Sequence, residues 1–547
     1  MQTNPAASAD SNRETSSPDI LNNDASVRNP NVPEASDEKP QRDFRFWAII
    51  IALCTVSLLS AAENTVVVTA LPTIVEKLNV GQDYVWISNI FFLTSAAIQP
   101  LCGQLSNLFG RRHLALSIVA IYIIGSGICG GAKNSAMLIA GRAIQGMGSG
   151  GINMIIDIIV SDLVPLRQRG NFIAIIIAIY GGVIVENTSW RWVFYINLPI
   201  GGLAFILLFL FLRVKWDRST TAYEKIRQID YIGNAILIAS TVSILIALTW
   251  ADVLYPWKSW HILVPLVVGV GGLVLFVVFE GLPFVVEPVM PLRLFSNRTA
   301  VIVYVISFLN SAENYWQFFF IPLYFQSVRL SSPSQSGVEL LVYSLVGIPG
   351  AAIALLMLSR WGRYKIIHII GSAMFTLGLG LLSIMDQSTS TAAWIWINIV
   401  TALGTSMLTN TLLPAFQASL KEEDQAAATA SWNFIRSFGN VWGVAIAAAI
   451  FNSFTASYAP MIEDPRARAL LTSGNSYASA TKAFVESFEE PARQQIRTVF
   501  TLSLQKVFLI GVPLSGFVFL SVLFEKEVKL RTELKTEFGL EERKTGT

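Results

Sequence analysis

The chain has 547 residues, of which 53% are hydrophobic and only 14% are charged. Soluble domains carry about 25% charged residues, so this composition excludes an ordinary soluble protein. The charges gather in the N-terminal segment, in short loops and after Phe524, and the apolar runs between them are near the ~20 residues that span a bilayer. The sequence therefore predicts an all-α polytopic membrane protein.

The net charge of +2 gives no indication of a nucleic-acid partner. Cys54, Cys102 and Cys129 all fall within apolar runs, where free cysteine behaves as a small core residue. Their positions predict neither a disulfide framework nor a metal site.

The apolar runs divide the chain into two similar halves. A basic turn with glycine occurs near residue 110, and a weaker version of it occurs at Ser359–Lys365. Such a repeat is expected for an internal duplication around a central site. We predict about fourteen spans in the following order: a disordered cytoplasmic tail at 1–45, a six-helix half at 46–214, a loop and two inserted helices at 215–281, a second six-helix half at 282–524 with an extracellular loop at 452–500, and a cytoplasmic tail at 525–547.

A tight basic turn, Gly103–His113, separates two of the apolar runs. Gly103 and Gly110 permit close approach or a sharp turn, and Arg111 and Arg112 favour the cytoplasmic side. Lys and Arg gather in every second turn of the predicted topology, so both termini are expected inside. On charge alone the stretch is a positive-inside loop. Its Gly-Arg-Arg spacing is more specific than that.

Ionisable side chains inside spans are the first candidates for function, because a charge is costly in a bilayer. At 1.5 Å per residue, Glu63 and Arg142 both come to about two-thirds of the way across from the inside, so an ion pair between them is feasible. The pair is either a protonation switch or a permanent structural contact.

Two further carboxyl groups are candidates for carrying protons. Glu313 lies in the middle of a span among Asn310, Asn314 and Gln317, which suggests a wet surface. Glu313 either carries a proton or contacts a cationic part of a substrate, and its alternative role is that of a hydrogen-bonded packing residue. Asp157 lies near the cytoplasmic end of its span, either at the membrane interface or on a proton path.

Signatures of enzymes are missing from the sequence. It contains no HExxH, no Walker loop and no CxxC pair. Without a nucleotide-binding domain, transport would be driven by an ion gradient, most simply of protons, and no cofactor is expected.

These motifs resemble those of the major facilitator superfamily, in particular fungal fourteen-span drug:proton antiporters of the toxin and secondary-metabolite efflux type. The loop matches at Gly103, Gly110, Arg111 and Arg112, while Asn107 stands where the family usually has Asp. The resemblance implies a coupling role for Arg142 and substrate contacts for Gln145, Tyr324 and Gln326. It also covers four further segments: Glu63–Pro72, Arg142–Gly146, Ser189–Pro199 and Pro322–Gln326.

One segment departs from the family pattern. The apolar part of the fifth span, Phe172–Val185, would reach only about 20 Å and lacks the Gly-Pro signature of such antiporters. Either the gene model omits residues near Tyr180–Gly182, or the hinge is altered and activity is lost. The sequon at Asn187 lies too near the bilayer for us to expect glycosylation.

The resemblance implies a major facilitator fold and proton-coupled export of amphipathic small molecules, without enzymatic activity. A proton-coupled importer of a nutrient or siderophore and an inactive remnant are the alternatives. We expect a monomer in the plasma membrane, or in a vacuolar or vesicle membrane, whose partners are lipid, protons and a small-molecule substrate.

Overall fold

The computed structural model describes these residues: 44–57, 59, 78, 84–163, 191–212, 227, 229–251, 255–283, 285, 288–421, 424–472, 476–528 and 530. Glu63, most of the segment 1–45, the fifth span with Glu186 and Asn187, and nearly all of the loop 215–228 lie outside them.

The first half of the described chain consists of helices. It begins with an apolar helix at Phe44–Ser57, so the helix starts just inside the predicted tail. The others are α2 (Tyr84–Phe109), α3 (Arg111–Gly130), α4 (Ser135–Leu163), the short α6 (Trp192–Tyr195) and α7 (Asn197–Phe211). Two further helices, α9 (Tyr231–Trp250) and α10 (Trp260–Glu280), form the predicted insertion.

The second half has six long helices: α11 (Arg298–Leu323), α12 (Pro333–Trp361), α13 (Tyr364–Leu382), α14 (Thr391–Ala418), α15 (Gln425–Tyr458) and α19 (Ala492–Leu523). A π-helical turn, η4 (Tyr324–Val328), ends α11, and short elements join the rest: η3 (Leu292–Phe295), η6 (Ala459–Met461), α16 (Pro465–Thr472), α17 (Ser476–Ser479) and α18 (Lys482–Glu486).

Nine helices of the described part are long and apolar enough to cross a membrane, and three shorter apolar helices accompany them. The protein is therefore a multi-pass membrane protein, as predicted. The full count of fourteen stays a prediction. Helix α11 has the length but is not among the nine, because polar residues in its middle lower its hydropathy.

The stretch predicted as a loop at 452–500 is largely helical where it is described. Helix α15 continues to Tyr458, and α19 begins at Ala492. Between them, α16 and α18 bury Leu471 and Val485 against the core of the second half. Burial of apolar side chains therefore orders this region despite its polar composition.

Glycines bring the helices of each half together. Gly146 and Gly150 of α4 lie against the backbone of α2, and Gly148 lies against Tyr122 of α3. In the second half, Gly439 and Gly443 of α15 lie against carbonyl groups of α11. Side chains at these positions would collide with backbone, so each half is locked by close helix contact.

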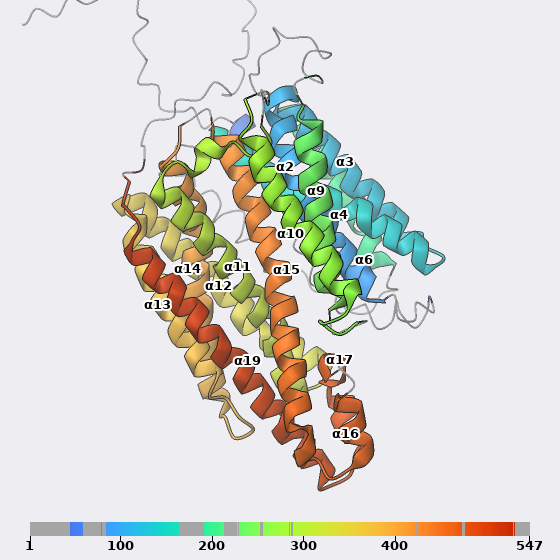
Figure 1. Ribbon diagram of the computed structural model, residues 1–547. Helices are drawn as coiled ribbons and strands as arrows, with labels where there is room; N and C mark the ends of the chain where they lie inside the picture. Colours follow the sequence, from blue (N-terminus) through green and yellow to red (C-terminus); the bar gives the residue numbers. More distant parts are fainter. Residues whose placement is uncertain are drawn as a thin grey trace, which may run out of the picture. The chain divides into compact units, whose positions relative to one another are not determined.

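Helix α15 joins the two halves. It packs on α11 and α19 of its own half and on α2 and α4 of the other, as its position beside α11 in Figure 1 illustrates. The inserted pair α9–α10 contacts the same junction through α2 and α15. We call the end of the bundle with Arg111 and Arg112 the inner end, following the distribution of Lys and Arg.

The residues after α19 lie across the inner ends of α11 and α13. The hydroxyl of Tyr364 donates to the carbonyl oxygen of Lys526 at 2.8 Å and accepts from the N–H of Val528 at 2.9 Å. Nδ1 of His368 lies 2.9 Å from the carboxylate of Glu525, and both side chains are fully buried. The predicted C-terminal tail therefore starts with a segment packed on the helices.

We expect His368→Ala to lower the stability of the purified protein by about 2 kcal/mol, because the buried carboxylate of Glu525 loses its partner. The measurement is thermal unfolding in detergent. The control is Glu486→Gln, which removes an exposed contact of 3.7 Å to Lys482 and should change stability by less than about 0.5 kcal/mol. Equal effects of the two substitutions on thermal unfolding would show that the contact between His368 and Glu525 does not stabilise the protein.

Candidate functional site

A buried network in the first half holds Arg142. Its Nε donates to the carbonyl oxygen of Ile87 in α2 at 3.0 Å, and one terminal nitrogen donates to Oε1 of Gln145 at 2.8 Å. The guanidinium lies 4.1 Å from the ring centre of Phe91. Gln145 in turn donates to Ser126 of α3 at 2.9 Å and is fully buried. The network therefore ties α2, α3 and α4 together, and it places Gln145 as a partner of Arg142.

The loop signature forms a rigid inner turn. Gly110 has a φ of 81°, which favours glycine. Arg111 is buried and forms an ion pair of 2.8 Å with Asp162, and Arg112 donates to the carbonyl oxygen of Phe209 at 2.7 Å. Asn107 lies in the last turn of α2, and its side chain is outside the described part. The turn therefore binds the inner ends of α2, α3, α4 and α7 to one another.

Gly103 lies at the junction of the halves. Its Cα faces the side chain of Ala430 in α15 so closely that an added Cβ would overlap with it. The first glycine of the signature is therefore required by contact between the halves.

A row of polar residues lies along α15, and two of its members contact the first half. Asn433, Arg436, Ser437 and Asn440 follow the i, i+3, i+4, i+7 spacing of one helix face. Asn433 donates to Oδ2 of Asp157 in α4 at 3.1 Å, and Ser437 accepts from Gln99 of α2 at 3.0 Å. We call these four residues, with Asp157 and Gln99, the polar seam.

Asp157 thus belongs to the contact between the halves. Its carboxylate is held by Asn433 and interacts electrostatically with Arg436. The sequence placed it near the inner end of its span but gave no indication of the helix opposite.

Polar residues of α11 form a second cluster inside the other half. Asn310 donates to Thr409 of α14 at 2.9 Å, and Asn314 accepts from the hydroxyl of Tyr343 in α12 at 2.8 Å. Glu313 and Gln317 are 1% and 0% exposed, and among the described residues their carboxylate and amide atoms have no hydrogen-bond partner. The carboxylate of Glu313 faces the backbone of Ser515 in α19.

The structure does not bring Tyr324 and Gln326 into either cluster. Both lie in η4, where the hydroxyl of Tyr324 donates to the carbonyl oxygen of Asp386 at 2.8 Å and Gln326 lies 3.5 Å from Ser336. Hydrogen bonds donated by Ser388 lower the pKa of the Asp386 side chain, which lies in the turn between α13 and α14. This end of α11 is therefore anchored to a loop of its own half.

Arg436 is the residue that the sequence analysis missed. It lies within an apolar run of the second half, and the rule that selected Arg142 applies to it equally. The spacing of Asn433, Arg436 and Asn440 was the available signal.

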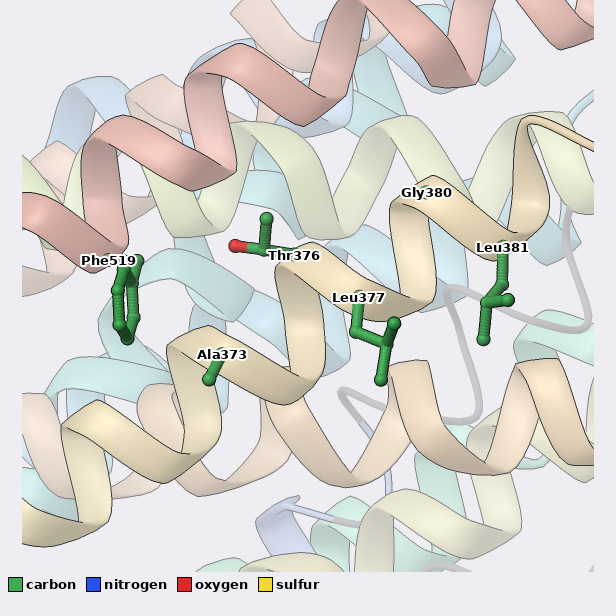
Figure 2. A pocket seen from close by; sticks show the side chains of 6 residues that line it. All are labelled: Ala373, Thr376, Leu377, Gly380, Leu381 and Phe519. Atoms are coloured by element: carbon green, nitrogen blue, oxygen red, sulfur yellow. The ribbon is translucent and has the colours of Figure 1, made fainter.

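A groove of about 470 Å³ is lined by none of these polar residues, and Figure 2 shows the six side chains that line it. Leu377 is 57% exposed, and Thr376 is the one polar side chain among the six lining residues. The groove is formed on α13 and α19 by Ala373, Thr376, Leu377, Gly380, Leu381 and Phe519. Its apolar lining does not offer the polar groups that orient a substrate.

Within the described residues no group of three His, Cys, Asp or Glu side chains could hold a metal ion. The buried polar residues are instead arranged between and within two helical halves. The sequence profile of the Major Facilitator Superfamily matches residues 53–444. The chain belongs to the major facilitator superfamily. Members of this superfamily are membrane transporters of small molecules and not enzymes.

Fungal members of the superfamily are similar over nearly the whole chain. The MFS-type transporter TwmF of Talaromyces wortmannii is 49% identical, covering 94% of this chain and 95% of that protein. The MFS-type efflux transporter ffsH of Aspergillus flavipes is 42% identical over 94% and 90%, and the MFS efflux transporter aclA of Aspergillus oryzae is 39% identical over 93% and 95%.

Solved structures support the fold. The human organic anion transporter MFSD10 has a TM-score of 0.58 at 12% identity, covering 87% of this chain and 99% of that chain. The proton:xylose symporter XylE has a TM-score of 0.54 at 14% identity, covering 89% and 97%. At these identities the likeness concerns the fold alone.

We expect Gly103→Val to separate α2 from α15 and to reduce disulfide cross-linking between cysteines introduced at Gln99 and Ser437 by about tenfold. The reason is the overlap of a side chain at position 103 with Ala430. Gly202→Val in α7 is the matched control, because the space around Gly202 is open. Unchanged cross-linking in Gly103→Val would show that the halves do not depend on this contact.

Proposed function

We propose that this transporter exports amphipathic small molecules in exchange for protons. The observation that carries the proposal is the pair of carboxyl groups at membrane depth, Asp157 at the junction of the halves and Glu313 in α11, which is buried and has no hydrogen-bond partner among the described residues. The efflux names of the relatives ffsH and aclA support the outward direction.

The junction is the element that would change. In this structure the inner part of α15 is closed against the first half, and its contacts include Asn433 with Asp157, Ser437 with Gln99, and Ala430 with Gly103. A substrate that enters from the inner side requires these contacts to separate. Two of them are single hydrogen bonds worth about 1 kcal/mol each, so a change of charge at these residues shifts the equilibrium between the closed and open junction.

Protons would bias this equilibrium through Asp157. As a carboxylate it attracts Arg436 and accepts from Asn433, and both interactions favour the closed junction. Protonation removes the negative charge, so the attraction to Arg436 is lost and the inner side opens more readily. Release of the proton on the other side of the membrane restores the contact. The sequential use of one carboxyl group on both sides is what couples proton flow to transport.

Glu313 would act within the second half. A carboxylate without a counter-charge is costly at this depth, and binding a proton removes that cost. Since α11 contacts α14, α15 and α19, a change in charge at Glu313 acts on the helix that carries the polar seam. Glu63 and Arg142 are proposed as a further coupling pair in the first half, and Asn310, Asn314 and Gln317 as polar contacts of the substrate.

We expect Glu313→Gln and Asp157→Asn each to lower pH-gradient-driven transport by about tenfold, because the coupling free energy is lost. Glu63→Gln and Arg142→Ala should act in the same direction. The measurement uses the full chain in proteoliposomes with an imposed pH gradient, and a compound chosen by a susceptibility and accumulation screen with and without the protein.

Exchange of labelled for unlabelled substrate without a gradient separates coupling from folding. It should stay within about twofold in the two carboxyl variants, since exchange needs no net proton movement. Glu463→Gln, at an exposed position in the connection between η6 and α16, should leave both assays unchanged. Gradient-driven uptake by the wild type, or normal export by the carboxyl variants, would contradict the proposal.

We further propose that the protein resides in the plasma membrane, where export of a toxic compound protects the cell. A fluorescent fusion of the full chain should label the cell periphery. A signal on vacuoles or vesicles would instead assign transport into an internal compartment.

A further inference from the structure

Arg436 lies deep in the membrane at the junction of the halves. It is the twelfth residue of α15, so it stands about 17 Å from the inner end of a helix that crosses a core of ~30 Å. A permanent cation at this depth is costly, since arginine does not lose its proton in proteins. Its presence at this depth calls for an interaction that offsets this cost.

The neighbours of Arg436 offset the cost only in part. The guanidinium lies 4.6 Å from the ring centre of Trp432, and Trp432 is fixed by a hydrogen bond of 2.9 Å from its Nε1 to Ser307 of α11. Among the residues that the structure describes, no acceptor receives a hydrogen bond from the guanidinium. Because the aromatic ring covers one face of the planar group, the N–H donors at its edge remain available.

Two titratable side chains face Arg436 from other helices. Asp157 of α4 and the hydroxyl of Tyr315 in α11 both interact with it electrostatically. Among the described residues, Asp157 accepts a hydrogen bond from Asn433, and no ion-pair contact joins it to Arg436. The opposite charges are therefore close enough to attract but are not directly bonded.

Aromatic side chains adjoin the same place. Phe92 of α2 and Tyr315 of α11 meet edge to face at 6.2 Å across the junction, and Phe318 and Phe319 follow on α11. An amphipathic molecule with one anionic group fits this arrangement, since its apolar part meets the rings and its charge meets the guanidinium.

We propose that Arg436 binds the acidic group of the transported molecule, a carboxylate or comparable oxyanion. Asp157 is its counter-charge in the unloaded carrier, so the substrate acid and Asp157 compete for one cation. This inference rests on the proposed transport function and specifies the chemical class of its substrate.

The test is equilibrium binding to the full chain in lipid nanodiscs, without any gradient. The probes are dansylaminoundecanoic acid and its primary amide, which differ in the charge at one end. We expect the wild type to bind the acid about tenfold more tightly than the amide, the gain typical of a charge-assisted hydrogen bond.

Two substitutions should then move this preference in opposite directions. Arg436→Gln should reduce the ratio to about one while binding of the amide is retained, which shows that the variant is folded. Asp157→Asn should strengthen binding of the acid by a few-fold, because the competing charge is removed. Arg466→Gln is the control, since Arg466 also faces an aromatic ring, at 6.0 Å from Phe488, but lies on α16.

Equal binding of acid and amide by the wild type, or an unchanged preference in Arg436→Gln, would overturn the inference. Neither result bears on proton coupling, because the assay has no gradient. The wild type could instead transport an uncharged substrate with the pH gradient, and the carboxyl variants could lose that transport. In that case the proposed function stands and this inference fails.

Discussion

The cost of placing charge in hydrocarbon governs the arrangement of this protein. Each ionisable side chain at membrane depth needs either a partner or a reason to lack one. Arg142 has backbone, amide and aromatic partners within the first half, and Arg111 has Asp162. Asp157 and Arg436 are different, because they are divided between the halves and attract one another without bonding. Their free energy therefore depends on how the halves are placed, which makes them sensitive to motion.

Two kinds of helix contact set where motion can occur. Within each half, glycines bring backbones together at Gly146, Gly150, Gly439 and Gly443. Contacts of this kind do not slide without collision, so each half behaves as one body. Between the halves the described contacts combine side-chain hydrogen bonds and the small-residue contact at Gly103 with apolar packing, since Phe438 of α15 shares a hydrophobic cluster with Leu93 of α2. No backbone-to-backbone glycine contact is described at this boundary, and the charges of the polar seam lie there.

Most of the architecture could be predicted from sequence. Long apolar runs and the alternation of basic turns predict the helical class, and the six long helices of the second half fall within the predicted range 282–524. The exception is 452–500, which was predicted as a loop. That stretch was misjudged because its apolar residues are sparse and become buried only through tertiary contacts, as Leu471 and Val485 show. Asp157 and Glu313 were found because a carboxyl group stands out in an apolar run.

The partners of these residues were beyond the reach of sequence. No local sequence feature predicts that Asn433 contacts Asp157, since the two residues are 276 positions apart in the chain. Tyr324 and Gln326 were assigned to the substrate from motif likeness, whereas their hydrogen bonds lead to the turn between α13 and α14 and to α12. Arg436 shows a different failure. Its charge stands out in an apolar run as much as that of Arg142, and the spacing to Asn433 and Asn440 predicts a polar helix face.

The length of α15 has a mechanical consequence. Its 34 residues extend about 51 Å, well beyond a hydrocarbon core of ~30 Å. From Ala430 to Tyr458 the helix forms an arm of about 42 Å, so a tilt of only ~10° about the contact with Gly103 would displace its tip by about 7 Å. The helices α16 and α18 share a hydrophobic core with Phe451 of that arm and would travel with it. A small rearrangement at the inner side of the membrane is thereby amplified into a large displacement of α16 and α18 at the opposite end. A protein that binds these two helices would then restrict the movement of α15.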